Sequence, residues 1–190
     1  MKNRRKKGKN RTGFTLVELL LAVSLSIMVF AAMGLLVGKC FSLWKDSTAH
    51  WRLSQYARIS RERILSGITN KVSGGVTNLT GLLSASNAVV TAELGYTVIN
   101  YGRMDEGSMV YQIRGWPGEN ENKHLEIRKG SADWVYALSS GSSEPDIKVD
   151  CFTASVTNHV VTIVYRLQLS AAGKNFYQKQ TIITSLLNED

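Results

Sequence analysis

Hydrophobic and polar positions change their pattern twice along the chain. Residues 14–38 are almost wholly apolar, and Glu18 is the one ionisable side chain among them. Twenty-five residues at about 1.5 Å each make a helix of about 38 Å, longer than the bilayer's hydrocarbon core of about 30 Å. This stretch therefore predicts a membrane-spanning helix. A carboxylate inside such a helix is costly, which makes Glu18 a candidate functional residue.

The helix is predicted to continue beyond the membrane over residues 39–66. Neither proline nor glycine occurs there, and apolar residues recur at helical spacing. The predicted face consists of Phe41, Trp44, Thr48, Trp51, Tyr56, Ile59 and Arg63, broadened by Leu53, Ala57, Ile64 and Leu65. Trp44 and Trp51 either pack under a folded domain, or Trp44 belongs to the aromatic belt at the membrane surface. Gly67 and the pair Gly74-Gly75 are expected to end the helix.

From Val76 onward, short runs with strand-like composition are separated by glycine, asparagine and serine. The predicted strands are Ala88–Ala92, Tyr96–Tyr101, Ser108–Ile113, His124–Lys129, Trp134–Leu138, Asp146–Ser155, Val160–Leu169 and Phe176–Leu186. The last two flank residues 170–175 and form a predicted hairpin, while residues 115–122 are the clearest loop. The sequence thus predicts an α+β fold, with a long N-terminal helix followed by a mainly antiparallel β-sheet head over residues 67–190.

Basic residues are concentrated before the apolar stretch. Seven of the 23 lysines and arginines lie in residues 1–13, so the remaining 16 nearly balance the 15 acids and leave a net charge of +1. A nucleic-acid surface needs basic residues clustered on the folded part, and we therefore expect no direct nucleic-acid binding. A basic block before a membrane span stays in the cytoplasm, which predicts that the rest is exported. The apolar stretch is too long for an ordinary secretory signal.

The junction between these two regions carries an ordered series of residues. Gly13 ends the basic block, Phe14 opens the apolar stretch, Thr15-Leu16-Val17 follow, and Glu18 stands fifth after the junction. This series resembles the N-terminal signal of type IV pilins and type II secretion pseudopilins, and the resemblance covers roughly residues 1–30. It implies that a prepilin peptidase removes residues 1–13 by cutting after Gly13 and methylates the new amino group of Phe14.

The resemblance also implies that Phe14 and Glu18 act in assembly. An α-amino group has an ordinary pKa near 8 and is largely cationic at neutral pH, so the amine of an incoming subunit can pair with the Glu18 carboxylate of a docked one. Pairing offsets part of the desolvation cost of both charges and would set the axial register of a filament. The alternative is an unprocessed single-pass membrane protein with a periplasmic ligand-binding β domain.

Within this family, the apolar stretch is similar to that of minor subunits. Major pilins often have a proline in the middle of this helix, where this chain has Leu35. The missing proline, the helix over residues 39–66 and the closing hairpin are similar to a J-type minor pseudopilin of type II secretion. Glu18 argues against the tip subunit, which lacks this acid.

The resemblance further implies a location and a set of partners. The chain is expected in the bacterial inner membrane with its head in the periplasm, and later in a pseudopilus or pilus. The expected partners are the prepilin peptidase, other pilin or pseudopilin subunits, the inner-membrane assembly machinery and membrane lipid.

The sequence contains no motif typical of catalysis. His50, His124 and His159 are scattered without zinc-ligand spacing, and no nucleophile elbow, phosphate-binding loop or dinucleotide-binding pattern occurs. We therefore expect no enzyme activity, no cofactor and no dedicated metal site, with calcium binding by irregular loop oxygens left open.

Two further sets of residues have uncertain roles at this level. Cys40 and Cys151 are expected to be separate thiols, because they fall at a membrane-helix end and in a distant strand. Trp116, Trp134 and Tyr177 mark either a contact surface or, as is more usual for strand aromatics, the core.

Overall fold

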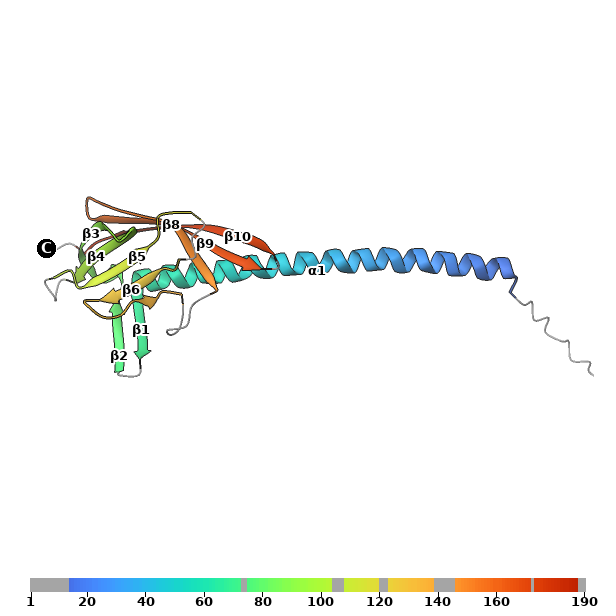
Figure 1. Ribbon diagram of the computed structural model, residues 1–190, viewed down its shortest axis with the longest axis horizontal. Coiled ribbons are helices and arrows are strands. Elements are labelled where there is room, and N and C mark those ends of the chain that lie inside the picture. The colour runs from blue at the N-terminus through green and yellow to red at the C-terminus, as the bar shows by residue number, and fades with distance from the viewer. Residues whose placement is uncertain are drawn as a thin grey trace, which may run out of the picture. The chain divides into compact units, whose positions relative to one another are not determined.

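The computed structural model describes residues 14–72, 75–103, 108–119, 123–138, 146–171 and 173–187. It contains one long helix followed by antiparallel sheets, which confirms the predicted α+β class (Figure 1). The chain falls into two compact units that divide between Lys45 and Asp46. Helix α1, Leu16–Ser66, contributes residues to both units.

The first unit is helical and carries its apolar side chains on the outside. Every residue from Phe14 to Lys45 is exposed. A helix that is apolar all round is typical of a membrane span or of the centre of a larger assembly. Within the described residues, α1 is the one helix long and apolar enough to cross a membrane.

The second unit contains residues 46–66 of α1, which bury one narrow face. The buried residues are Ala49, Leu53, Ala57, Ser60 and Ile64. Their spacing of three and four residues keeps them on one side of the helix. The predicted face was right for Leu53, Ala57 and Ile64, which are buried, and wrong for its large aromatic residues, because Phe41, Trp44 and Trp51 are 57%, 63% and 62% exposed. The face combines two large apolar side chains, Leu53 and Ile64, which are fully buried, with the small residues Ala49, Ala57 and Ser60.

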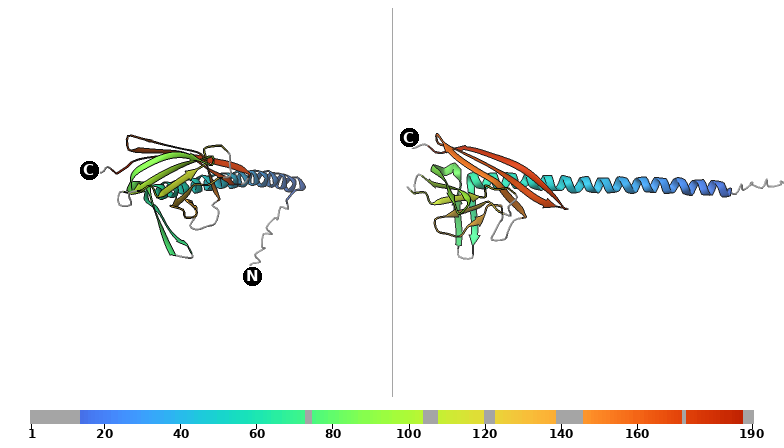
Figure 2. Two further views of the ribbon diagram at one scale, coloured as in Figure 1. Left: turned by 60° about the vertical axis from the view of Figure 1, so that its left-hand side comes forward. Right: turned by 45° about the horizontal axis from the view of Figure 1, so that its top comes forward.

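Among the described residues, the second unit also contains three antiparallel sheets. One is a hairpin of β1 (Gly67–Val72) and β2 (Gly75–Thr80), which the short 3-10 helix η1 (Leu82–Ser84) follows. The second contains, in spatial order, β3 (Ala85–Glu93), β4 (Tyr96–Arg103), β5 (Tyr111–Gly115), β6 (Glu126–Lys129) and β7 (Val135–Tyr136). The third has the order β10 (Lys174–Ser185), β9 (Val160–Ala171) and β8 (Ile147–Thr157), whose long strands are seen best in Figure 2.

Each of the eight predicted strands overlaps one of β3 to β10, with errors at the ends. Strand β5 begins at Tyr111 instead of Ser108, and β7 is limited to two residues. Strands β1 and β2 were both missed, because the first predicted strand begins at Ala88. Gly67 does end the helix, and its φ of +93° is the left-handed conformation that glycine adopts at a helix C-terminus. The chain then enters β1 directly, whereas Gly75 opens β2 and plays no part in ending the helix.

The closing hairpin confirms the alternation read from the sequence. Val161, Ile163, Tyr165 and Leu167 of β9 are all fully buried. The predicted loop over residues 170–175 was too long, because Ala171 pairs with Lys174 and leaves two positions between the strands. The core also reaches the helix, where the Ser60 and Tyr165 hydroxyl oxygens are 2.7 Å apart.

Candidate functional site

Of the residues in the series Gly13 to Glu18, Phe14 and Thr15 precede α1 and Glu18 lies in its first turn. Gly13 lies outside the described residues, and Phe14 is 84% exposed. The backbone N–H and the hydroxyl of Thr15 both donate to Oε2 of Glu18, at 3.0 and 3.2 Å. In return, the backbone N–H of Glu18 donates to the Thr15 hydroxyl oxygen at 3.3 Å. This reciprocal pattern is a capping box, in which two side chains satisfy each other's free backbone donors at a helix start.

The capping box gives the Glu18 carboxylate a defined position in the first turn. A carboxylate in the first turn also interacts favourably with the partial positive charge of the helix N-terminus. Glu18 therefore starts the helix in addition to any role in assembly. This role was not predicted from the sequence, although the spacing Thr15-x-x-Glu18 is the signature of a capping box.

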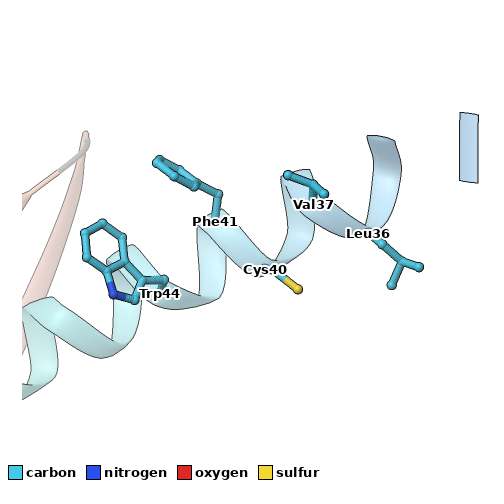
Figure 3. Close-up of a pocket in the computed structure, with 5 residues that line it drawn as sticks. All are labelled: Leu36, Val37, Cys40, Phe41 and Trp44. Atoms are coloured by element: carbon cyan, nitrogen blue, oxygen red, sulfur yellow. The ribbon is translucent and has the colours of Figure 1, made fainter. Parts of the chain in front are cut away.

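A shallow apolar groove lies farther along the same unit (Figure 3). Its lining residues are Leu36, Val37, Cys40, Phe41 and Trp44. The rings of Phe41 and Trp44 are 5.8 Å apart between centroids, and the Lys45 ammonium lies 5.2 Å from the Phe41 ring centre. Aromatic rings beside a lysine are typical of the membrane–water boundary, where rings and cations both reach the headgroups.

In the second unit, aromatic and basic side chains gather on the outer face of the five-stranded sheet. The Arg114 guanidinium lies 4.6 Å from the centre of the Tyr96 ring and 3.9 Å from that of Trp134. Arg128 lies 4.2 Å from the Trp134 ring centre, and Arg114 donates to Glu126 at 2.5 Å. Trp134 is half-buried on this face and so belongs to a surface cluster, outside the hydrophobic core.

A second ordered group lies on the three-stranded sheet. Asp150 is fully buried, and both its carboxylate oxygens accept hydrogen bonds from Arg166 at 2.8 Å. These bonds raise the pKa of Arg166, so the guanidinium stays charged at any physiological pH. Arg166 also lies 4.9 Å from the Tyr177 ring centre, and Tyr177 is 43% exposed. Tyr177, like Trp134, is therefore a surface residue.

The side chains that could carry other chemistry are dispersed. Cys40 is exposed and Cys151 half-buried, and both are free thiols. Burial, followed by the negative charge of Asp150, raises the pKa of the Cys151 thiol and so disfavours the reactive thiolate. His124 is buried against the carbonyl of Ile147, whereas His50 is exposed beside Phe176. Within the described residues, no three of His, Cys, Asp and Glu are grouped as metal ligands.

Comparison with protein-family models, with curated proteins and with solved structures gave no match to this chain.

Proposed function

We propose that this chain is a minor, pilin-like structural subunit of a type II secretion pseudopilus or type IV pilus. The observation that carries the proposal is the ordered motif from Gly13 to Glu18 in front of an apolar helix. Two structural features support it. The motif's acid occupies the first turn of α1, and the helix residues after it are exposed and apolar, as a helix that packs against lipid or other subunits requires.

In this proposal, a prepilin peptidase cuts after Gly13 and the new amine of Phe14 is methylated. The cut places a cationic amine one residue before Thr15, which already binds Glu18. Within the membrane, the amine of an incoming subunit pairs with the Glu18 carboxylate of a subunit in place, since both charges are costly to leave alone in lipid. The head remains in the periplasm, and the assembly machinery of the inner membrane moves the processed subunit into the filament.

The first experiment determines the N-terminus of the protein. The full chain is produced in bacterial membranes with and without an active prepilin peptidase, and intact mass and N-terminal sequence are measured. We expect the mature chain to begin at Phe14 and to carry one added methyl group when the peptidase is present. A chain that still begins at Met1 beside an active peptidase would exclude this proposal and leave a single-pass membrane protein whose head supplies the function.

Two variants separate processing from assembly. Gly13→Leu places a bulky side chain at the cut, where glycine allows close approach to the backbone, and should abolish processing. Glu18→Gln keeps the size of the side chain but removes its charge. It should be cut normally yet fail to cross-link to other subunits through the helix. Equal cross-linking of Glu18→Gln and the native chain would refute the role of this carboxylate in assembly.

A further inference from the structure

Two arginines of the five-stranded sheet lie against the same tryptophan ring. The guanidinium carbons (Cζ) of Arg114, on β5, and Arg128, on β6, are 3.9 and 4.2 Å from the centre of the Trp134 ring. The strand register places both side chains on one face of the sheet, because Arg114 is opposite Glu126 and Arg128 is opposite Gln112. The fold therefore keeps two like charges close together.

Both arginines are held through the same nitrogen atom. Nε of Arg114 donates to the Glu126 carboxylate at 2.5 Å, and Nε of Arg128 donates to the side-chain carbonyl oxygen of Gln112. Within the described part of the chain, neither guanidinium makes another hydrogen bond or ion pair, and none of its nitrogen atoms is buried without a partner. The terminal Nη groups, which carry most of the N–H donors of an arginine, are therefore accessible.

A chain of hydrogen bonds from β6 to β3 holds Arg128 in position. The side-chain amide of Gln112 donates to Oδ1 of Asn100 at 2.5 Å, and Nδ2 of Asn100 donates to the Thr91 hydroxyl oxygen at 2.9 Å. The Thr91 hydroxyl in turn donates to Oε1 of Glu93 at 3.2 Å. Every member donates in the same direction, and aligned hydrogen bonds strengthen one another. The guanidinium of Arg128 is thus preorganised by the side chains behind it.

The charges around the two arginines leave one positive charge unbalanced. Among the described residues, Glu126 is the one acid that bonds to either of them. The Lys123 ammonium adds a further positive charge, 5.8 Å from the centre of the Tyr96 ring, on which Arg114 also lies at 4.6 Å. Stacking on aromatic rings offsets only part of the repulsion between the cations. One additional carboxylate would balance the charge, and its two oxygens match the paired N–H groups of a guanidinium.

We propose that Arg114 and Arg128 form a binding site for one carboxylate, which an aspartate or glutamate of a partner protein supplies. The carboxylate accepts hydrogen bonds from the free Nη groups of both arginines, beside the Trp134 ring. Tryptophan, tyrosine and arginine are the residues enriched among those that dominate binding energy at protein interfaces.

The overall charge of the chain favours a single carboxylate over a polyanion. Nucleic acid or an anionic membrane surface would need basic residues in clear excess, whereas 16 basic and 15 acidic residues follow Gly13. The acid Glu126 also lies within the site itself. The site belongs to the second unit and does not depend on how α1 is processed or assembled.

The first test uses a short acidic peptide as the probe. A blocked peptide with one central glutamate is titrated against the full chain in detergent, and the same peptide with glutamine is the matched probe. Nitrogen-15 NMR follows the indole N–H of Trp134 and the Nε–H groups of Arg114 and Arg128. We expect the glutamate peptide to shift these signals saturably, with a dissociation constant in the millimolar range, and the glutamine peptide to leave them unchanged. Equal shifts with both peptides, or no shift with either, would overturn the proposal.

Three variants separate recognition of the carboxylate from simple charge. Arg128→Lys keeps the charge but removes the fork of N–H groups, and should weaken binding of the glutamate peptide roughly tenfold. Gln112→Leu removes the bond that positions Arg128 and should weaken binding by a smaller factor. Arg58→Lys, at an exposed position on α1, is the matched control and should bind like the native chain.

Thermal unfolding of the same variants distinguishes binding from stability. The midpoint of Arg128→Lys should stay within about 2 °C of the native value, because the change lies at the surface of the sheet. If Arg128→Lys lowered the midpoint but bound the glutamate peptide as the native chain does, the two arginines would serve only the fold, and the proposal would be wrong.

The second test searches for the partner in membranes. A photoreactive benzoylphenylalanine replaces the exposed Asp133, next to Trp134, in the full chain, and cross-linking is carried out in membranes of cells that naturally contain the protein. We expect a protein adduct whose cross-linked segment contains an aspartate or glutamate. Most of this adduct should be lost in Arg128→Lys and kept in Arg58→Lys. Labelling of lipid alone, the absence of any protein adduct, or an equal yield in Arg128→Lys would overturn the proposal.

Discussion

The two units of this protein use one helix in opposite ways. From Phe14 to Lys45 the apolar side chains cover every side of α1, and all of them are exposed. From Asp46 to Ser66 a single face is buried, and it contains Ala49, Leu53 and Ala57. The second pattern is explained by the chain's own sheets, which cover that face. No described residue covers the exposed apolar side chains of Phe14 to Lys45 in the same way.

This difference shows where each part obtains its stability. A helix that is apolar all round needs a nonpolar environment, either lipid or other helices, because water makes its exposed surface unfavourable. A helix with one apolar face needs only a sheet or helix to cover that face. The first unit is therefore incomplete without a partner or a membrane, and the second carries its own core. Substitutions of the same kind in the two parts of α1 should have unequal effects.

The largest difference in stability between the two parts of α1 is expected when a leucine is replaced by alanine. Leu53→Ala removes a fully buried side chain and should lower the free energy of unfolding by about 2–5 kcal/mol, since a cavity remains in the core. Leu25→Ala, at a position 61% exposed, is the matched control and should leave the head's stability unchanged. Urea unfolding of the full chain in detergent, followed by near-ultraviolet circular dichroism, measures both. Equal losses would mean that the two parts of α1 do not differ.

The reverse change tests how tightly the sheets pack on the helix. Ala57 is 5% exposed, and Ala57→Leu forces extra volume against the strands, which should destabilise the head by about 1–3 kcal/mol. Ala31→Leu adds the same volume to an exposed position and should have no effect on the head. The same urea titration applies. If Ala57→Leu were neutral, the core beside Ala57 would have room for a larger side chain.

Burial was predicted correctly from the sequence for strand β9 and only in part for helix α1. Alternation in β9 predicted the strand and its buried side chains, because each inward position carries a large apolar residue such as Ile163 or Leu167. The predicted helix face included Leu53, Ala57 and Ile64 correctly, but it was centred on Phe41, Trp44 and Trp51, since large apolar residues were expected to be buried. The residues that are buried there include the small side chains of Ala49, Ala57 and Ser60, because burial depends on which side of the helix the sheets cover and not on the size of the side chain.

The candidate site was only partly predictable for a related reason. The spacing of Thr15 and Glu18 contained the capping box, and the sequence could have revealed it. Outside that site, the two-residue turn of Leu94 and Gly95 between β3 and β4 could not be predicted, because a leucine before a glycine becomes unusual only when the strand register places it at positive φ. The surface positions of Trp134 and Tyr177 likewise depend on which sheet face the helix covers.

Alkaline pH is a third test that distinguishes the two units, because it should destabilise the head through a buried tyrosine. Burial raises the pKa of Tyr165 to about 12, whereas its ordinary value is 10.0. Its contribution to stability is therefore complete below pH 10 and is lost as the pH rises through about 12. At pH 11 we expect the head to be destabilised by about 1 kcal/mol from this residue.

Tyr165→Phe should remove that part of the alkaline dependence. The hydroxyl of Ser60 keeps its bond to the carbonyl of Ala57, so the variant leaves no buried donor without a partner on the helix. Absorbance of tyrosinate at 295 nm against pH gives the ionisation directly. Titration of every tyrosine near pH 10 would contradict the burial of this side chain.

The smallest effect is expected at the start of α1. Thr15→Ala removes both hydroxyl bonds of the capping box and should weaken the first helical turn by about 1 kcal/mol, while leaving the unfolding of the head unchanged. Hydrogen exchange of the backbone amides in that turn should then be about fivefold faster, since 1.4 kcal/mol corresponds to a factor of ten. Thr15→Ser keeps a hydroxyl and is the matched control. If Thr15→Ala lowered the stability of the head as much as that of the first turn, the two units would be coupled through the helix. The division between Lys45 and Asp46 would then not separate two independently stable parts.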